Sequence, residues 1–212
     1  MTQKLILPLN KTLLGVGYKA AAYPQFTQDN NMGRLIHYGH DYRLSSGSDK
    51  RIWGSGKGRV IDCGEDAVVG FYVIVRYEDV IGANRKAYKV LTFRYFHLEK
   101  GSIKVSKGQS ITKDTVIATM GNTGKYSTGV HLHLEIDTDE NENYARWSPT
   151  ISLNPGAGSS AIKGGIDTTI NPGEILFIKP SSPDYQEFVL DSDTHYKGES
   201  WFNTSDNIIQ TV

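Results

Sequence analysis

The sequence has very little cysteine and no excess of charge of either sign. Cys63 is the only cysteine among the 212 residues, so no disulfide can form within the chain, and we expect a small buried side chain there. Lysine plus arginine and aspartate plus glutamate each total 23, which gives a formal net charge of zero. A dominant nucleic-acid interface, which needs a basic excess, is therefore not expected.

Long apolar runs are also missing. No stretch is long and apolar enough to form a helix that spans a membrane. The apolar run at residues 5–9 is too short for the core of a signal peptide, and Pro8 interrupts it. We therefore expect no membrane span and no recognisable export sequence, in a chain that forms one domain with or without an extension.

Long helical periodicity is absent as well, whereas runs rich in β-branched and aromatic residues are frequent. Glycine-containing turns separate these runs, as expected for short strands. The predicted strands are residues 68–77, 88–97, 102–105, 115–120, 130–136 and 175–178. This pattern indicates an all-β, or β-dominated, fold.

The chain changes character after Ile136. Residues 137–143 are acidic and polar, and residues 154–165 are rich in glycine and serine, so we expect a long loop in this part of the chain. The tail at residues 184–212 is polar with scattered aromatic side chains. We expect these aromatic residues to pack an extension onto the domain rather than to bind glycan.

Histidines gather in three short clusters, and the first also contains an aspartate. In the segment His37-Tyr38-Gly39-His40-Asp41, the central glycine favours a turn or irregular segment rather than a helix. A turn can bring the imidazole of His37 and the carboxylate of Asp41 to one point, and both are good zinc ligands. We expect His40 to point away from this site.

The second cluster lies on a predicted strand. Because side chains alternate along a strand, His131, His133 and Glu135 should share one face, and the leucines and isoleucine between them should face the core. The third cluster holds His97 at the end of another predicted strand. A lone histidine at a strand end is usually structural, and polar faces of strands often carry histidine. Neither cluster by itself therefore indicates a metal or catalytic site.

Together the three clusters supply what a hydrolytic zinc site needs. Catalytic zinc takes three protein ligands and keeps a fourth position for water. The metal lowers the pKa of that water from ~15.7 toward ~7, and a nearby imidazole can accept a proton or stabilise the oxyanion.

Three motifs of the chain resemble those of the lysostaphin-like and LytM-like zinc endopeptidases, which cut bacterial peptidoglycan. The family patterns are H-x-G-x-D, Y-x-H-L and G-x-T-G-x-S-T-G-P-H-L-H-F-E. They correspond here to residues 37–41, 95–98 and 121–135. Shorter similarities lie between the motifs, so the resemblance covers residues 35–176 in the right order.

The resemblance implies an antiparallel β-sheet whose floor forms a groove walled by loops. It implies that His37, Asp41 and His133 bind Zn²⁺. It also implies that His97 and His131 are catalytic residues that flank the bound water. His131 is preferred as general base and His97 as an electrostatic or proton-transfer partner, but the sequence alone does not divide these roles. The substrate would be a peptide of peptidoglycan, a stem peptide or a cross-bridge, cut at the bacterial cell wall outside the cytoplasm. Without a signal peptide, a phage or prophage origin or another export route would take the protein there.

The resemblance also implies a division of the chain. Residues 1–34 would be an N-terminal segment packed on the domain, residues 35–180 the zinc peptidase domain, and residues 181–212 a C-terminal extension. The segment 137–169 is longer than the usual connection in the family and would be an insertion beside the active site. Val130 replaces the usual proline before H-L-H, which costs loop rigidity but no chemistry.

Three alternatives have sequence features in their favour. The first is a catalytically inactive domain of the same fold that acts as a binding or regulatory module, although such relatives typically lose metal ligands. The second is a lipoyl- or biotinyl-type carrier, in which Lys113 would be modified, but the expected flanking residues are missing. The third is a sugar-phosphotransferase domain, which would need neither Asp41 nor zinc.

Overall fold

Strands dominate the computed structural model, as predicted: about half of the described residues lie in strands and very few in helices. It describes residues 2–18, 37–44, 46–125, 127–142 and 168–178, together with the backbone of strands 187–190 and 210–211. No helix within these ranges is long and apolar enough to cross a membrane. The predicted β-dominated, antiparallel fold class is confirmed.

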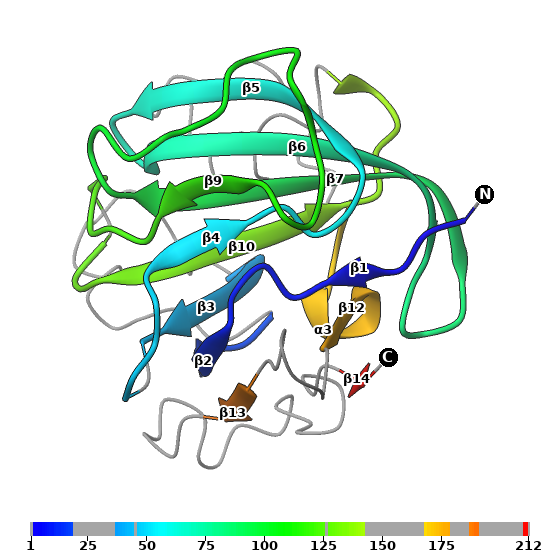
Figure 1. Cartoon of the computed structure of the whole chain (residues 1–212), viewed down its shortest axis with the longest axis horizontal. Helices are drawn as coiled ribbons and strands as arrows, with labels where there is room; N and C mark the ends of the chain where they lie inside the picture. The colour runs from blue at the N-terminus through cyan, green and yellow to red at the C-terminus, as the bar shows by residue number, and fades with distance from the viewer. Residues whose placement is uncertain are drawn as a thin grey trace, which may run out of the picture.

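A nine-stranded sheet forms the main layer of the molecule (Figure 1). Its strand order is β13-β2-β3-β10-β7-β6-β5-β8, with β11 paired to β10. All pairs from β2 to β8 are antiparallel, and β13 lies parallel to β2. The strands are β2 (Lys11–Val16), β3 (Gly39–Arg43), β5 (Gly58–Asp66), β6 (Gly70–Ile81), β7 (Ala87–Leu98), β8 (Ser110–Ile111), β10 (His131–Asp137), β11 (Thr169–Ile170) and β13 (Glu187–Leu190).

Two smaller sheets lie against the main one. One is the pair β4 and β9, drawn in front of the main sheet in Figure 1, and the other is β1-β12-β14, whose pairs are parallel. Their strands are β1 (Leu5–Ile6), β4 (Arg51–Trp53), β9 (Val116–Thr119), β12 (Leu176–Ile178) and β14 (Gln210–Thr211). A single helical turn, α3 (Pro172–Ile175), precedes β12, and the Asn171 side chain accepts a hydrogen bond from Gly173 N at 2.9 Å.

The main sheet has one face in the hydrophobic core and one face that carries polar side chains. On β10, Leu132, Leu134 and Ile136 belong to the core, together with residues of β4, β9, β1 and β12. The alternation predicted for this strand is therefore confirmed, and His131, His133 and Glu135 lie on the opposite face. Every cross-strand neighbour of these polar residues shares that face, which we call the site face.

The strand predictions are right in type, with one exception. Residues 102–105 are not a strand: Ser102 N donates to Glu99 O in a turn, and Lys104 N makes an isolated bond to Ile117 O. Ile103 and Val105 nevertheless pack against the core, so the apolar pattern reflects burial without a strand ladder. Cys63 is half-buried against the core, less enclosed than predicted.

Several predictions concern parts of the chain outside the described residues. These parts are residues 19–36, most of the insertion (143–167) and most of the tail (179–186 and 191–209). The division into residues 1–34, 35–180 and 181–212 stays a prediction. Within the first of these segments, β1 pairs with β12 and β2 pairs with β3.

Candidate active site

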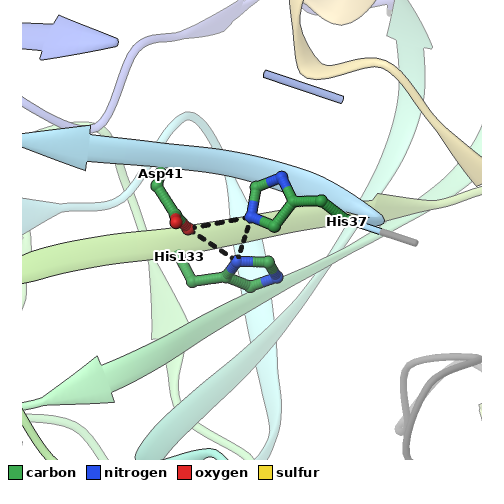
Figure 2. A group of neighbouring side chains, drawn as sticks. All are labelled: His37, Asp41 and His133. Atoms are coloured by element: carbon green, nitrogen blue, oxygen red, sulfur yellow. Dashed lines mark hydrogen bonds and ion pairs between the residues drawn. The ribbon is translucent and has the colours of Figure 1, made fainter. Parts of the chain in front are cut away.

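Three side chains that are far apart in the sequence meet on the site face (Figure 2). His37 Nε2 lies 3.0 Å from Asp41 Oδ1 and 3.0 Å from His133 Nδ1, and the last two atoms are 2.8 Å apart. One possible ligand atom from each of the three residues lies within 4.8 Å of the other two. Their side chains keep exposed fractions of 12%, 10% and 11%, so the cluster is largely desolvated yet still reachable.

Strand register brings two of the three side chains together. Asp41 on β3 is directly opposite His133 on β10, so both project from the same face of neighbouring strands. His37 precedes β3 and reaches the same point from the end of the strand (Figure 2).

The segment 37–41 is not helical, as predicted, and residues 37–38 are irregular, but a turn at Gly39 is wrong because Gly39 begins the extended strand β3. A Cβ atom at this position would lie 2.3 Å from the carbonyl oxygen of Leu134. Glycine is therefore needed here for close approach of β3 to β10 rather than for a turn.

The second nitrogen of each imidazole in the cluster has its own partner. His37 Nδ1 lies 2.7 Å from the carbonyl oxygen of Gly17 and must donate to it, which leaves Nε2 without a proton in the neutral ring. His133 Nε2 lies 3.1 Å from Glu135 Oε1 and donates to that carboxylate, so Nδ1 faces the cluster. Two imidazole nitrogens and a carboxylate oxygen, each held by outer partners, are a donor set that fits a zinc ion.

His97 reaches the site through a β-bulge. The register of β6 against β7 shifts between Phe71 and Val73, so β7 has an extra residue, and His97 has a φ of +61°. Strict alternation would place His97 on the core face with Tyr95. The bulge turns it to the site face instead, where its ring centroid lies 4.8 Å from that of His131 and 5.9 Å from that of His133.

The two histidines outside the cluster are oriented in the same way. His97 Nδ1 donates to the carbonyl oxygen of Thr123 at 2.8 Å, and His131 Nδ1 donates to that of Gly129 at 2.8 Å. In the neutral ring each therefore has an unprotonated Nε2. His131 Nε2 lies 3.8 Å from Asp41 Oδ1, at the edge of the cluster.

Burial and charge act in opposite directions on the ionisable groups. Burial would raise the pKa of Asp41, but the charges of His37 and His131 and hydrogen bonds from His133 hold it well below its usual value. Burial would lower the pKa of His133, but hydrogen bonds to Asp41 and Glu135 raise it to about 10. Burial, helped by the neighbouring imidazoles, lowers the pKa of His97 to about 3, so this ring is neutral at physiological pH.

Comparison with known protein families shows which family the chain belongs to. The family model described as peptidase family M23 matches residues 35–145, more than half of the chain. The chain belongs to peptidase family M23. The resemblance noted in the sequence is thereby confirmed, and the carrier and phosphotransferase alternatives are excluded.

Individual relatives of this M23 chain are distant. The peptidoglycan DD-endopeptidase ShyA of Vibrio cholerae is 32% identical over 100 residues, which are 47% of this chain and only 20% of ShyA. The catalytic domain of lysostaphin from Staphylococcus simulans is 22% identical, with a TM-score of 0.47 over 62% of this chain and 84% of that one. A chain of the SpoIIQ–SpoIIIAH pore-forming complex is 19% identical, with a TM-score of 0.50 over 83% of this chain and 92% of that one, and shares the fold.

All five predicted site residues of the M23 chain lie together on the site face. His40, as expected, lies away from them: it is fully buried, and its Nδ1 is 3.0 Å from the hydroxyl of Tyr42. The sequence analysis did not identify the carbonyl partners at Gly17 and Thr123. It also missed Arg94, a fully buried arginine that pairs with Glu135. A charged residue between the apolar Phe93 and Tyr95 was the available indication of its role.

Proposed function

We propose that this M23 chain is a zinc-dependent endopeptidase that hydrolyses peptide bonds in bacterial peptidoglycan. The observation that carries the proposal is the convergence of three ligand atoms beside two imidazoles, each with Nδ1 held by a backbone carbonyl. A structural metal site needs no such flanking imidazoles, whereas a hydrolytic site uses them.

His37 Nε2, Asp41 Oδ1 and His133 Nδ1 would hold the zinc ion, one atom from each residue. When bound there, zinc supplies Lewis acidity, polarising a carbonyl and lowering the pKa of water toward ~7. Three protein ligands leave a position for water or substrate.

His131 is the proposed general base. Its Nδ1 proton is held by Gly129 O, so the bare Nε2 accepts a proton from the attacking water and later returns it to the leaving amine. His97 has a lowered pKa and stays neutral, so its Nε2 acts as a hydrogen-bond acceptor that orients water rather than as a cation.

The substrate class rests on the relatives. ShyA, which shares 32% identity with about half of this chain, is a peptidoglycan DD-endopeptidase. We therefore place the activity at the bacterial cell wall, in the extracellular or periplasmic space, with a peptide of peptidoglycan as substrate.

Digestion of purified peptidoglycan tests the proposal. We expect the zinc-loaded chain to release peptide fragments with new amino termini, identified by mass spectrometry, and a chelator to abolish their release. His131→Ala is the matched control, because it leaves all three ligands in place. A chain that carries zinc but releases no fragment would instead be a binding module.

A further inference from the structure

A buried group of three charged side chains lies beside the proposed zinc ligand His133, on the same face of the main sheet. Arg94 on β7 is fully buried between two carboxylates on β10, Glu135 and Asp137, which are themselves buried. Arg94 Nη1 lies 2.9 Å from Glu135 Oε2, and Nη2 is hydrogen-bonded to Asp137 Oδ2. Arg94 and Glu135 are direct cross-strand partners, so the pairing is part of the sheet register.

Stability alone is a poor reason for this group. Removing three charges from water costs a large desolvation free energy, and well-packed apolar residues often stabilise such a position as well or better. The group also has two negative charges for one positive charge, so a further cation beside it is favourable. The proposed zinc ion would supply that charge on the side of Glu135 that faces His133.

Each oxygen of Glu135 has a separate partner. Oε2 accepts from Arg94, and Oε1 accepts from His133 Nε2 at 3.1 Å. Because His133 Nε2 is engaged in this way, only Nδ1 of the ring is available to the cluster of His37 and Asp41. The carboxylate therefore selects the ligand nitrogen and restrains rotation of the ring.

The far end of the group is attached to the root of the insertion. Asp137 Oδ1 accepts from Thr168 Oγ1 at 2.7 Å and from Asp139 N at 2.7 Å. Thr168 O in turn accepts from Thr138 N, and β11 pairs with the end of β10. The chain thus enters the insertion and returns from it next to Asp137, the carboxylate that is hydrogen-bonded to Arg94.

We propose that Glu135, held by Arg94, which Asp137 holds in turn, is a positioning residue that orients His133 for metal binding and ties this ligand to the root of the insertion. The inference rests on the proposed zinc site. It assigns no contact with substrate to Glu135, Arg94 or Asp137.

The substitution Glu135→Gln tests the inference with nearly unchanged volume. A glutamine has an amide group, which only donates, in place of one carboxylate oxygen, so it cannot accept at both positions where Arg94 and His133 donate to Glu135. We expect the zinc affinity, measured by competition with a chelator, to fall by about 10–100-fold. Asp137→Asn should cause a smaller fall, because its contact with His133 is indirect.

Glu142→Gln is the matched control. Glu142 is a partly exposed acid that follows β10 in the chain. It pairs with Arg59 on β5 and does not contact the site. It should leave zinc affinity within about twofold of the unmodified chain, as expected for a surface ion pair. Equal affinity for Glu135→Gln and Glu142→Gln would overturn the positioning role and leave the proposed function intact. If the unmodified chain bound no zinc, the proposed function itself would fail.

A second measurement needs no substitution and covers the case in which Glu135→Gln does not fold. In the zinc-loaded chain, ¹⁵N chemical shifts of the His133 ring should show a protonated Nε2 and a metal-bound Nδ1. A protonated Nδ1 with zinc on Nε2 would overturn the inference, because Glu135 could then no longer accept from this ring.

Discussion

Individual side chains at the site are oriented by single hydrogen bonds to their outer nitrogens. The carbonyl oxygens of Gly17, Thr123 and Gly129 and the carboxylate of Glu135 each engage one imidazole nitrogen. An oxygen without a proton can only accept, so each bond determines which nitrogen carries the hydrogen. The same side-chain type can thereby take the two proposed roles, metal ligand for His37 and His133 and acceptor of a proton or hydrogen bond for His131 and His97.

Alanine at two neighbouring positions on β10 should separate these roles. His133→Ala removes a proposed ligand, so we expect loss of bound zinc and of activity together. His131→Ala leaves the ligand set complete, so zinc should stay near one per chain while activity falls by about 10²–10⁴-fold. Metal analysis and peptidoglycan digestion measure the two effects. Retained activity in both variants would show the assignment to be wrong.

Zinc uptake should release a proton from His133. In the metal-free chain its pKa is raised to about 10, so below that pH a proton occupies the nitrogen that zinc would take. His133 therefore stabilises the metal-free fold below pH 6.5, and this stabilisation is lost as pH rises from 6.5 to about 10. Over the same window zinc affinity should increase.

Calorimetry in two buffers with different ionisation enthalpies checks this prediction. Near neutral pH the difference between the two binding enthalpies should correspond to about one proton released per zinc. His97 adds nothing to this number, since its lowered pKa of about 3 leaves it neutral throughout. Identical binding enthalpies in the two buffers would contradict a protonated His133.

Two features of the strands bring the site residues together. The close pairing of β3 with β10 sets Asp41 opposite His133, and the bulge in β7 turns His97 to the same face. A left-handed backbone conformation at a non-glycine residue costs ~1–3 kcal/mol, and the surrounding sheet must compensate for it. The backbone is thus irregular at the bulge and crowded at the β3–β10 contact, and both places lie at the proposed active site.

Gly39→Ala tests the close pairing. The added Cβ would lie 2.3 Å from Leu134 O, so β3 must move away from β10. We expect the free energy of unfolding to fall by about 1–3 kcal/mol and zinc affinity to fall as well, because the two strands carry different ligands. Denaturant unfolding and chelator competition measure these effects.

Gly64→Ala is the control for this substitution. A Cβ at Gly64 on β5 would meet only the end of the Tyr72 side chain, at 3.3 Å, and Gly64 contributes no ligand. Its zinc affinity should equal that of the unmodified chain. A Gly39→Ala chain that matches this control in both measurements would show that β3 and β10 need no glycine there.

Across the whole molecule, the site joins segments that are distant in the chain. His37 and His133 are separated by 96 positions, and His37 is held by a carbonyl 20 positions earlier. A metal bound by both histidines would close a long loop through the main sheet. Such a ligand set does not exist in the unfolded chain, so binding free energy becomes folding free energy.

Zinc should therefore raise the unfolding temperature. At a free zinc concentration of 100 times the dissociation constant, the gain in stability is about 2.7 kcal/mol. For a chain of this length, that gain corresponds to a rise of roughly 5–10 °C in the midpoint. Thermal unfolding with zinc and with a chelator measures it, and His133→Ala should show no difference. Equal midpoints for the unmodified chain would argue against a site shared by β3 and β10.

Much of the fold and of the candidate site could be predicted from local patterns. The alternation of β10 placed His131, His133 and Glu135 on one face, because a strand has a fixed side-chain period of two. Motif spacing identified the family that the comparison confirms. The function of Gly39 was predicted incorrectly, because glycine permits a turn and a close strand contact equally well.

The sequence by itself determined the types of donor available, the absence of any intrachain disulfide and the strands that carry the site. These are properties of composition and of short periodic segments. Only the tertiary structure decided which atoms meet, because cross-strand register, the bulge at His97 and the buried Arg94 pair depend on residues far apart in the chain. The hydrogen-bond partners of His97 and Arg94, Thr123 and Glu135, lie 26 and 41 positions away in the chain, so no local sequence pattern predicts them.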